Sequence, residues 1–171
     1  DSAAIEGGVD GSAAAETQRD ERIARAIDAL EAEHDFVLLL ANDNVDCWSR
    51  RCIRNADEML LLADATQPPA LHPVEQACLA GQPGRSEAAQ ILVLLHPDGT
   101  AMPRGVRQWL ARRPVAGHVN IRPMLPRDMA RLARIVSRNA VGLVLGGGGA
   151  RGFAHLGVWR ALAAGGIDID V

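Results

Sequence analysis

The sequence contains no lysine, and arginine supplies all 18 of its basic residues. A phosphate-binding P-loop of the GxxxxGK[ST] type requires a lysine after its second glycine, so that class of nucleotide site is excluded. The formal net charge is only −3 at pH 7. A near-neutral, slightly acidic chain argues against nucleic acid as the main partner.

Cysteines and long apolar runs are also scarce. Cys47, Cys52 and Cys78 form no CxxC pair, which favours reduced thiols over a metal site or a disulfide. The longest apolar runs, such as residues 36–41, are far shorter than the roughly 20 residues of a transmembrane helix. No charged-then-apolar leader opens the sequence. We therefore expect no metal, no membrane span and a cytoplasmic protein.

Alternating strands and helices are expected through most of the chain. Residues 1–16 are rich in Ala, Gly, Ser and acidic residues without a period, which predicts a flexible linker. A helix is expected from Thr17. Continuous apolar strands separated by helices are typical of a parallel sheet covered on both faces, so residues 17–123 are expected to form a doubly wound, Rossmann-like α/β module. The expected strands are 36–40, 59–63, 91–95 and 118–122, and the expected helices are 45–55, one from Pro73 and one from Pro103.

A connecting helix is expected within residues 124–139. Its apolar positions predict that Met129, Leu132, Ala133 and Val136 face inward. The other side carries a row of arginines offset only by Asp128. Such a basic face could rest on anionic lipid headgroups, be solvated, or pair with a neighbouring domain. The arginines of this row are Arg127, Arg131, Arg134 and Arg138.

A run of four glycines follows the apolar residues 141–145 and precedes an alanine-rich segment. This order predicts a strand, a loop without side chains and a helix, an arrangement that directs peptide N–H groups at an anion. One use is a dinucleotide fingerprint through Gly147, Gly149 and Gly152, with Asp168 or Asp170 as the ribose-binding acid. These aspartates, however, would begin the second strand rather than end it. The other use is an oxyanion hole for acyl transfer.

The sequence from Gly146, Gly-Gly-Gly-Gly-Ala-Arg-Gly-Phe-Ala-His-Leu-Gly-Val-Trp-Arg-Ala-Leu, strongly resembles the opening of the patatin-like phospholipase domain. Within that family it is most similar to bacterial relatives of neuropathy target esterase. The sequence from Cys47, Cys-Trp-Ser-Arg-Arg-Cys-Ile-Arg-Asn-Ala-Asp-Glu-Met-Leu-Leu-Leu, resembles the segment that precedes the catalytic domain in those proteins. The resemblance implies that residues 140–171 are the truncated N-terminal start of a patatin-like α/β hydrolase domain.

The family's site can be carried over in part. The resemblance implies that Gly147, Gly148 and Gly149 form the oxyanion hole and that Arg151 and Gly152 complete the G-G-G-x-[KR]-G signature. Such enzymes use a Ser–Asp dyad whose GxSxG and DGG or DGA motifs are absent from this chain. We therefore expect an excerpt of a serine phospholipase, lysophospholipase or esterase that is inactive alone.

The resemblance also implies partners. The substrate would be a phospholipid or lysophospholipid, no cofactor would be needed, and the protein could contact the inner face of the membrane peripherally. A cyclic-nucleotide-binding-like domain would precede this segment in the same polypeptide. The competing hypotheses are a non-catalytic regulatory or interaction module and, third, a dinucleotide-binding domain.

Several other single residues carry expectations of their own. His155 invites a general-base role, but the family's dyad needs no histidine, which favours a packed or hydrogen-bonded His155. Gly157 within a helix suggests close packing against the sheet, because glycine there costs about 1 kcal/mol relative to alanine. Trp48, Trp109 and Trp159 fall on apolar helix faces and are expected in the core.

Overall fold

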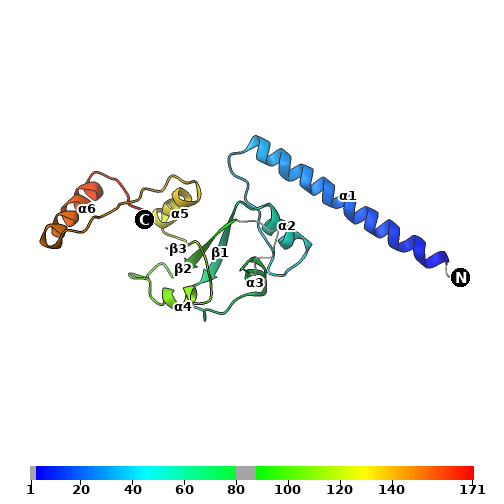
Figure 1. Cartoon of the computed structure of the whole chain (residues 1–171), viewed down its shortest axis with the longest axis horizontal. Coiled ribbons are helices and arrows are strands. Elements are labelled where there is room, and N and C mark those ends of the chain that lie inside the picture. Colours follow the sequence, from blue (N-terminus) through cyan, green and yellow to red (C-terminus); the bar gives the residue numbers. More distant parts are fainter. Residues whose placement is uncertain (1–2, 80–87) are drawn as a thin grey trace. The chain divides into compact units, whose positions relative to one another are not determined.

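The computed structural model describes residues 3–79 and 88–171. The chain divides into two units, the first ending at Ala41 and the second running from Asn42 to Val171 (Figure 1). Cys47 and Cys52 are free thiols, whereas the side chain of Cys78 lies outside the described part. Among the described residues, no helix combines the length and the apolar character needed to cross a membrane.

The first unit is dominated by α1, a single helix of 31 residues from Ala3 to Glu33. It begins within the segment expected to be a flexible linker and includes the helix expected from Thr17. The predicted strand 36–40 is wrong, because these residues have neither strand nor helix structure. Leu38 and Leu40 are each 86% exposed. An apolar run becomes a strand only where a neighbouring strand satisfies its backbone groups.

The second unit is built on a parallel sheet of three strands in the order β1-β2-β3. The register pairs Leu61 with Leu92 and Val93 with Val119. Its strands confirm three of the four predicted ones, and the parallel α/β class is also confirmed. The strands are β1 (Glu58–Asp64), β2 (Ala89–Leu95) and β3 (Gly117–Ile121).

The sheet has a hydrophobic cluster on each face, because successive residues of a strand point to opposite sides. On one face, Leu92 and Leu94 of the central strand β2 pack with Leu61 and Trp109. On the other face, Ile91 and Val93 pack with Val119 and Ile121, and the partly buried Leu132 and Ile135 lie against them. The side chains of Leu92, Val93 and Leu94 are fully buried. The strand is therefore covered on both sides, as its continuous apolar sequence predicts.

Helices flank the sheet and follow it, at positions close to the predicted ones. α2 (Cys47–Asn55) is capped by Asp46, whose carboxylate accepts a hydrogen bond from the Ser49 amide at 2.7 Å. α4 (Val106–Leu110) is shorter than expected, because Gly105 before it adopts a left-handed conformation with φ 78°. α6 (Ala154–Ala164) ends before Gly165, which is followed by Gly166 with φ 75°, a conformation that favours glycine. The other helices are α3 (Pro73–Leu79), α4 (Val106–Leu110), α5 (Pro126–Val136), the 3-10 helix η1 (Gly149–Phe153) and α6 (Ala154–Ala164).

The inner face of α5 differs from the predicted one. Leu132 packs against the sheet as expected, but the other residue of α5 that packs there is Ile135, which was not among the predicted positions. Met129 is 42% exposed, and Ala133 is also exposed. The helical period identifies an apolar stripe, but the angle at which α5 meets the sheet selects only part of that stripe for burial.

Candidate functional site

The segment before the glycines is not a regular strand, so the strand predicted at 141–145 is wrong, and Val144 is 95% exposed. Its beginning nevertheless contacts the last residue of the chain in parallel fashion. The Leu143 amide donates to the Val171 carbonyl at 3.0 Å, and the Val171 amide donates to the Val141 carbonyl at 3.4 Å. These two bonds have the slanted pattern of a parallel ladder. Residues 141–143 and 170–171 thus lie side by side.

The glycine loop, residues 146–149, leads directly into a helix, as the sequence predicts. Gly149 begins η1 with φ 52°, a left-handed conformation that favours glycine. One ring nitrogen of His155 lies 2.8 Å from the Gly146 carbonyl. His155 is therefore hydrogen-bonded to the loop, as expected. The Arg151 amide donates to the Gly148 carbonyl at 3.1 Å and closes the first turn.

The amides of the glycine loop are available to an incoming acceptor. Within the described part of the chain, no hydrogen-bond acceptor contacts the amides of Gly147, Gly148 or Gly149, and all three residues are exposed. They lie where η1 and α6 begin, so the partial positive charge of a helix N-terminus lies on the same side. This arrangement can bind an anion or stabilise a developing oxyanion.

The two other residues of the signature follow on the first helical turn. Arg151 is exposed, and Gly152 is half-buried. The loop and these two residues are thus contiguous, and Arg151 lies within reach of solvent. Nothing lies within 4 Å of a methyl group built at Gly157, so the expected close packing against the sheet is not observed.

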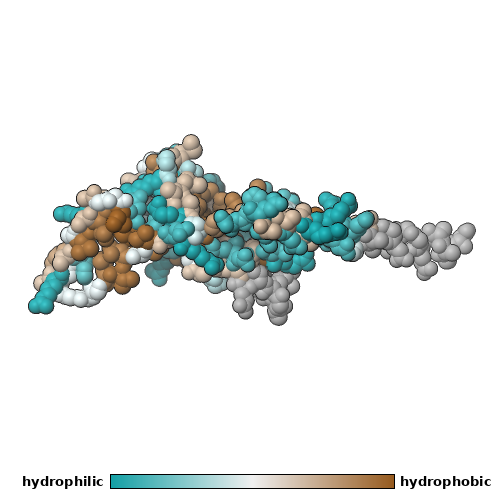
Figure 2. Space-filling model, turned by 90° about the horizontal axis from the view of Figure 1, so that it is seen from above, coloured by the Kyte–Doolittle hydropathy of each residue, from teal (hydrophilic) through white to brown (hydrophobic). Residues whose placement is uncertain are grey.

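Apolar side chains of α6 lie on the surface beside this loop. Figure 2 shows hydrophobic residues gathered over α6. Trp159 is 52% exposed and Leu156 56%, which corrects the expectation that Trp159 belongs to the core. Trp109 is buried as expected, and Trp48 is partly buried. The predicted apolar face of α6 is present, but no other element among the described residues covers it.

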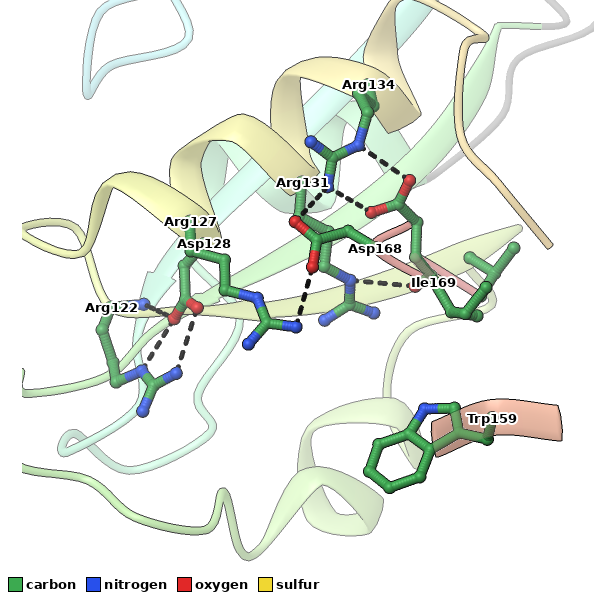
Figure 3. A pocket seen from close by; sticks show the side chains of 10 residues that line it. Arg122, Arg127, Asp128, Arg131, Arg134, Trp159, Asp168 and Ile169 are labelled. Atoms are coloured by element: carbon green, nitrogen blue, oxygen red, sulfur yellow. Dashed lines mark hydrogen bonds and ion pairs between the residues drawn. The ribbon is translucent and has the colours of Figure 1, made fainter. Parts of the chain in front are cut away.

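The arginines of α5 face the end of the chain (Figure 3). Arg134 donates two hydrogen bonds to the Asp170 carboxylate, at 2.9 and 2.7 Å. The same carboxylate accepts the Val141 amide at 3.0 Å, and its side chain is completely buried. The hydrogen bonds from Arg134 have the largest effect on the pKa of the Asp170 carboxyl, and together with the Val141 amide they hold it below its ordinary value. Asp170 therefore connects α5, the start of the glycine segment and the chain end.

The neighbouring arginines contact aspartates as well. Arg127 forms an ion pair with Asp168 at 2.9 Å. Arg122 donates to the Asp128 carboxylate at 2.7 and 3.0 Å and lowers the pKa of that carboxyl. Arg131 donates through Nε to the backbone carbonyl of Asp170 at 2.9 Å.

Two adjoining cavities lie along α5. The larger, about 510 Å³, is lined by arginines, aspartates and Trp159. The smaller, about 220 Å³, lies at the carboxyl ends of β2 and β3, where His96 contacts Asn120 at 2.9 Å. Both cavities share Arg122, Asp128 and Arg131 as wall residues. The residues that line the larger cavity are Arg122, Arg127, Asp128, Arg131, Arg134, Trp159, Asp168, Ile169, Asp170 and Val171.

These contacts decide between some of the sequence hypotheses. Asp168 and Asp170 are engaged by arginines, which disfavours either as a ribose-binding acid. The basic face of α5 is largely neutralised by pairing. The sequence identified the arginine row but missed its two aspartate partners, because they lie more than 30 residues away and belong to no local pattern. In residues 3–79 and 88–171, no group of three or more His, Cys, Asp or Glu side chains is placed to hold a metal ion.

Comparison with known proteins identifies the family. The model of the neuropathy target esterase family P-loop like domain matches residues 2–137. The chain is 34% identical over 187 residues to patatin-like phospholipase domain-containing protein 7 of Rattus norvegicus. It is 31% identical over 189 residues to patatin-like phospholipase domain-containing protein 6 of Homo sapiens. It is also 31% identical over 202 residues to lysophospholipase NTE1 of Pyricularia oryzae. No solved structure matches the chain significantly.

These alignments cover 94%, 94% and 88% of the chain but only 14%, 13% and 13% of the three relatives. The chain thus spans about one seventh of their length. The matched domain model ends at residue 137, so it includes α1 and α5 and stops before the glycine loop. The name of this domain includes the words P-loop like, but the sequence lacks the lysine that a GxxxxGK[ST] P-loop requires. The chain belongs to the neuropathy target esterase family of patatin-like phospholipase domain proteins.

Proposed function

We propose that these residues belong to a serine acyl hydrolase that cleaves phospholipids or lysophospholipids, and that the glycine loop supplies its oxyanion hole. The observation that carries this proposal is the set of three consecutive amides at Gly147, Gly148 and Gly149 without an acceptor in the described chain. The family relationship supports the reaction class, because the relatives are named phospholipases and a lysophospholipase. Ester cleavage passes through a tetrahedral intermediate whose oxygen carries the negative charge.

In this mechanism the serine hydroxyl of a Ser–Asp dyad attacks the ester carbonyl carbon, and the aspartate accepts the serine proton. The carbonyl oxygen becomes an oxyanion held by the loop amides. Collapse of the intermediate expels the alcohol, which takes up the proton, and water then releases the fatty acid from the acyl-serine. Neither the GxSxG nor the DGG or DGA motif of the dyad occurs in residues 1–171. We therefore propose that this chain alone is inactive and that Arg151 supports the loop or a lipid phosphate.

The organisation that fits this function has two parts. Residues 17–123, extended by the helix within 124–139, form a regulatory or scaffolding module, and residues 140–171 begin the catalytic domain. We propose a cytoplasmic enzyme that meets its lipid at the membrane surface, preceded in the polypeptide by a cyclic-nucleotide-binding-like domain. A purely non-catalytic role for the module remains the alternative, and activity measured with and without it separates the two.

The test uses the natural polypeptide that contains this sequence, with lysophospholipid hydrolysis as the readout. Gly149→Ala should lower kcat by up to about 10²–10³-fold, the loss found when one oxyanion donor is removed. The φ of Gly149 is 52°, a left-handed conformation that disfavours a residue with a Cβ, so the substitution should turn the loop amides away from the oxyanion. Gly99→Ala is the matched control, because nothing lies within 4 Å of its added methyl group.

Two results would contradict the proposal. One is ester hydrolysis by the 171-residue chain that a serine-directed fluorophosphonate inhibits. The other is unchanged kcat in Gly149→Ala.

A further inference from the structure

The charges around the larger cavity do not cancel. Four arginines and three aspartates line it. Arg122 engages Asp128, Arg127 engages Asp168, and Arg134 engages Asp170. Arg134 also lies 3.9 Å from Asp168. The three carboxylates are thus engaged by three of the four arginines, and one arginine is left over.

The remaining arginine is Arg131, in the middle of the row (Figure 3). Its Nε donates a hydrogen bond to the Asp170 carbonyl oxygen at 2.9 Å. No carboxylate of the described residues lies within ion-pair distance of its guanidinium. The side chain is nevertheless half-buried, so part of its hydration has been lost, and the carboxylates of Asp128 and Asp170 act on it only from beyond ion-pair distance.

Arg131 also holds a special position, because it lines both cavities. The larger cavity, about 510 Å³, falls within the size range of small-molecule sites, roughly 300–1,000 Å³. The smaller one lies at the carboxyl ends of two parallel strands, where open α/β sheets bind their ligands. A planar guanidinium with its Nη groups available suits a tetrahedral oxyanion with two acceptor oxygens.

We propose that Arg131 is the centre of an anion site that binds a phosphate group in these adjoining cavities. Arg122 and Arg134, each fixed by its own aspartate, form the electropositive wall, and Trp159 borders the site. The phosphate group could belong to a soluble phosphate ester or to a lipid headgroup. The proposal is independent of the oxyanion-hole assignment, because it involves none of the residues 146–152.

The test titrates the 171-residue chain with inorganic phosphate and with glycerol 3-phosphate at constant ionic strength, since salt alone screens surface charges. Binding is followed by calorimetry and by the fluorescence of Trp159, taken as the difference between the parent and Trp159→Phe. We expect saturable binding that Arg131→Gln weakens at least ten-fold. Arg138→Gln is the matched control: it removes the same charge just beyond α5, from a residue that lines neither cavity.

Vesicles distinguish the sources of the phosphate. Parent-chain binding to phosphatidylcholine vesicles that contain phosphatidic acid, lost in Arg131→Gln and retained in Arg138→Gln, assigns the site to a lipid headgroup. Binding of glycerol 3-phosphate without vesicle binding assigns it to a soluble ester. The proposal is overturned if the parent binds none of these probes, or if Arg131→Gln and Arg138→Gln bind equally. If circular dichroism shows that Arg131→Gln does not fold, Arg131→Lys replaces it, and undiminished binding by that variant overturns the two-oxygen contact.

Discussion

Arg134 and Asp170 are joined side chain to side chain by two hydrogen bonds of 2.9 and 2.7 Å, across 36 residues of sequence. The Asp170 carboxylate also accepts the Val141 amide, and the Asp170 amide donates to the Val141 carbonyl at 2.8 Å. A single buried carboxylate therefore attaches the segment before the glycine loop to α5.

Asp170→Asn should make the free energy of unfolding less sensitive to pH in the acid range. The Arg134 hydrogen bonds hold the pKa of Asp170 below its ordinary value, so the folded state binds this proton less readily than the unfolded state. The resulting stability is present above the ordinary pKa of about 4 and is lost as the pH falls toward the folded pKa. Urea unfolding between neutral pH and about pH 3 measures this slope.

The control for that measurement is Asp168→Asn. The Asp168 side chain is 44% exposed, and its change should leave the slope closer to that of the parent because water screens an exposed pair. Equal slopes for the parent and Asp170→Asn would show that the Asp170 carboxylate does not contribute as proposed.

Leu92→Ala should destabilise the second unit by about 2–5 kcal/mol, the usual cost of a cavity at a fully buried leucine. Leu92 is 0% exposed in the centre of β2, where it packs with Leu61 and Trp109. Leu62 on the neighbouring strand is 65% exposed, so Leu62→Ala should change stability by only about 0.5 kcal/mol. Chemical denaturation of both variants checks the difference, and similar losses would place the core elsewhere.

Glu75→Gln should destabilise the packing of α3 strongly. The Arg113 side chain is 1% exposed; its Nη2 donates to Glu75 at 2.8 Å, and its guanidinium lies 4.8 Å from the centre of the Trp109 ring. Removing the counter-charge leaves a buried cation, which costs about 3–5 kcal/mol. Thermal unfolding measures the loss against Glu21→Gln, a change at a carboxylate that is 64% exposed. A Glu75→Gln protein as stable as this control would refute the buried ion pair.

Gly157→Ala should stabilise α6 by about 0.5–1 kcal/mol, because alanine loses less backbone entropy in a helix. Space permits it, since no atom lies within 4 Å of the added methyl group. Gly149→Ala should have the opposite sign despite equal space, because φ there is 52° and the left-handed conformation costs a non-glycine residue roughly 1–2 kcal/mol. Helix content and melting temperature of the two variants give the comparison. Destabilisation by Gly157→Ala would mean that something packs closely on this face.

The sequence predicted the elements whose signals are local. The continuous apolar run of β2, for example, indicates a strand that is covered on both faces. The strands expected at 36–40 and 141–145 failed, because an apolar run does not reveal whether a neighbouring strand is present to pair with it. The glycine loop was found from its composition, whereas the Arg134–Asp170 contact joins residues that no periodicity relates.

Arg134 lies inside the region matched by the P-loop like domain, residues 2–137, and Asp170 lies outside it. A polypeptide cut between them would separate a buried anion from its cation, so neither fragment would retain the electrostatic environment it has in the intact chain. Attempts to study the proposed catalytic domain in isolation should therefore start upstream of Pro126, so that α5 is included.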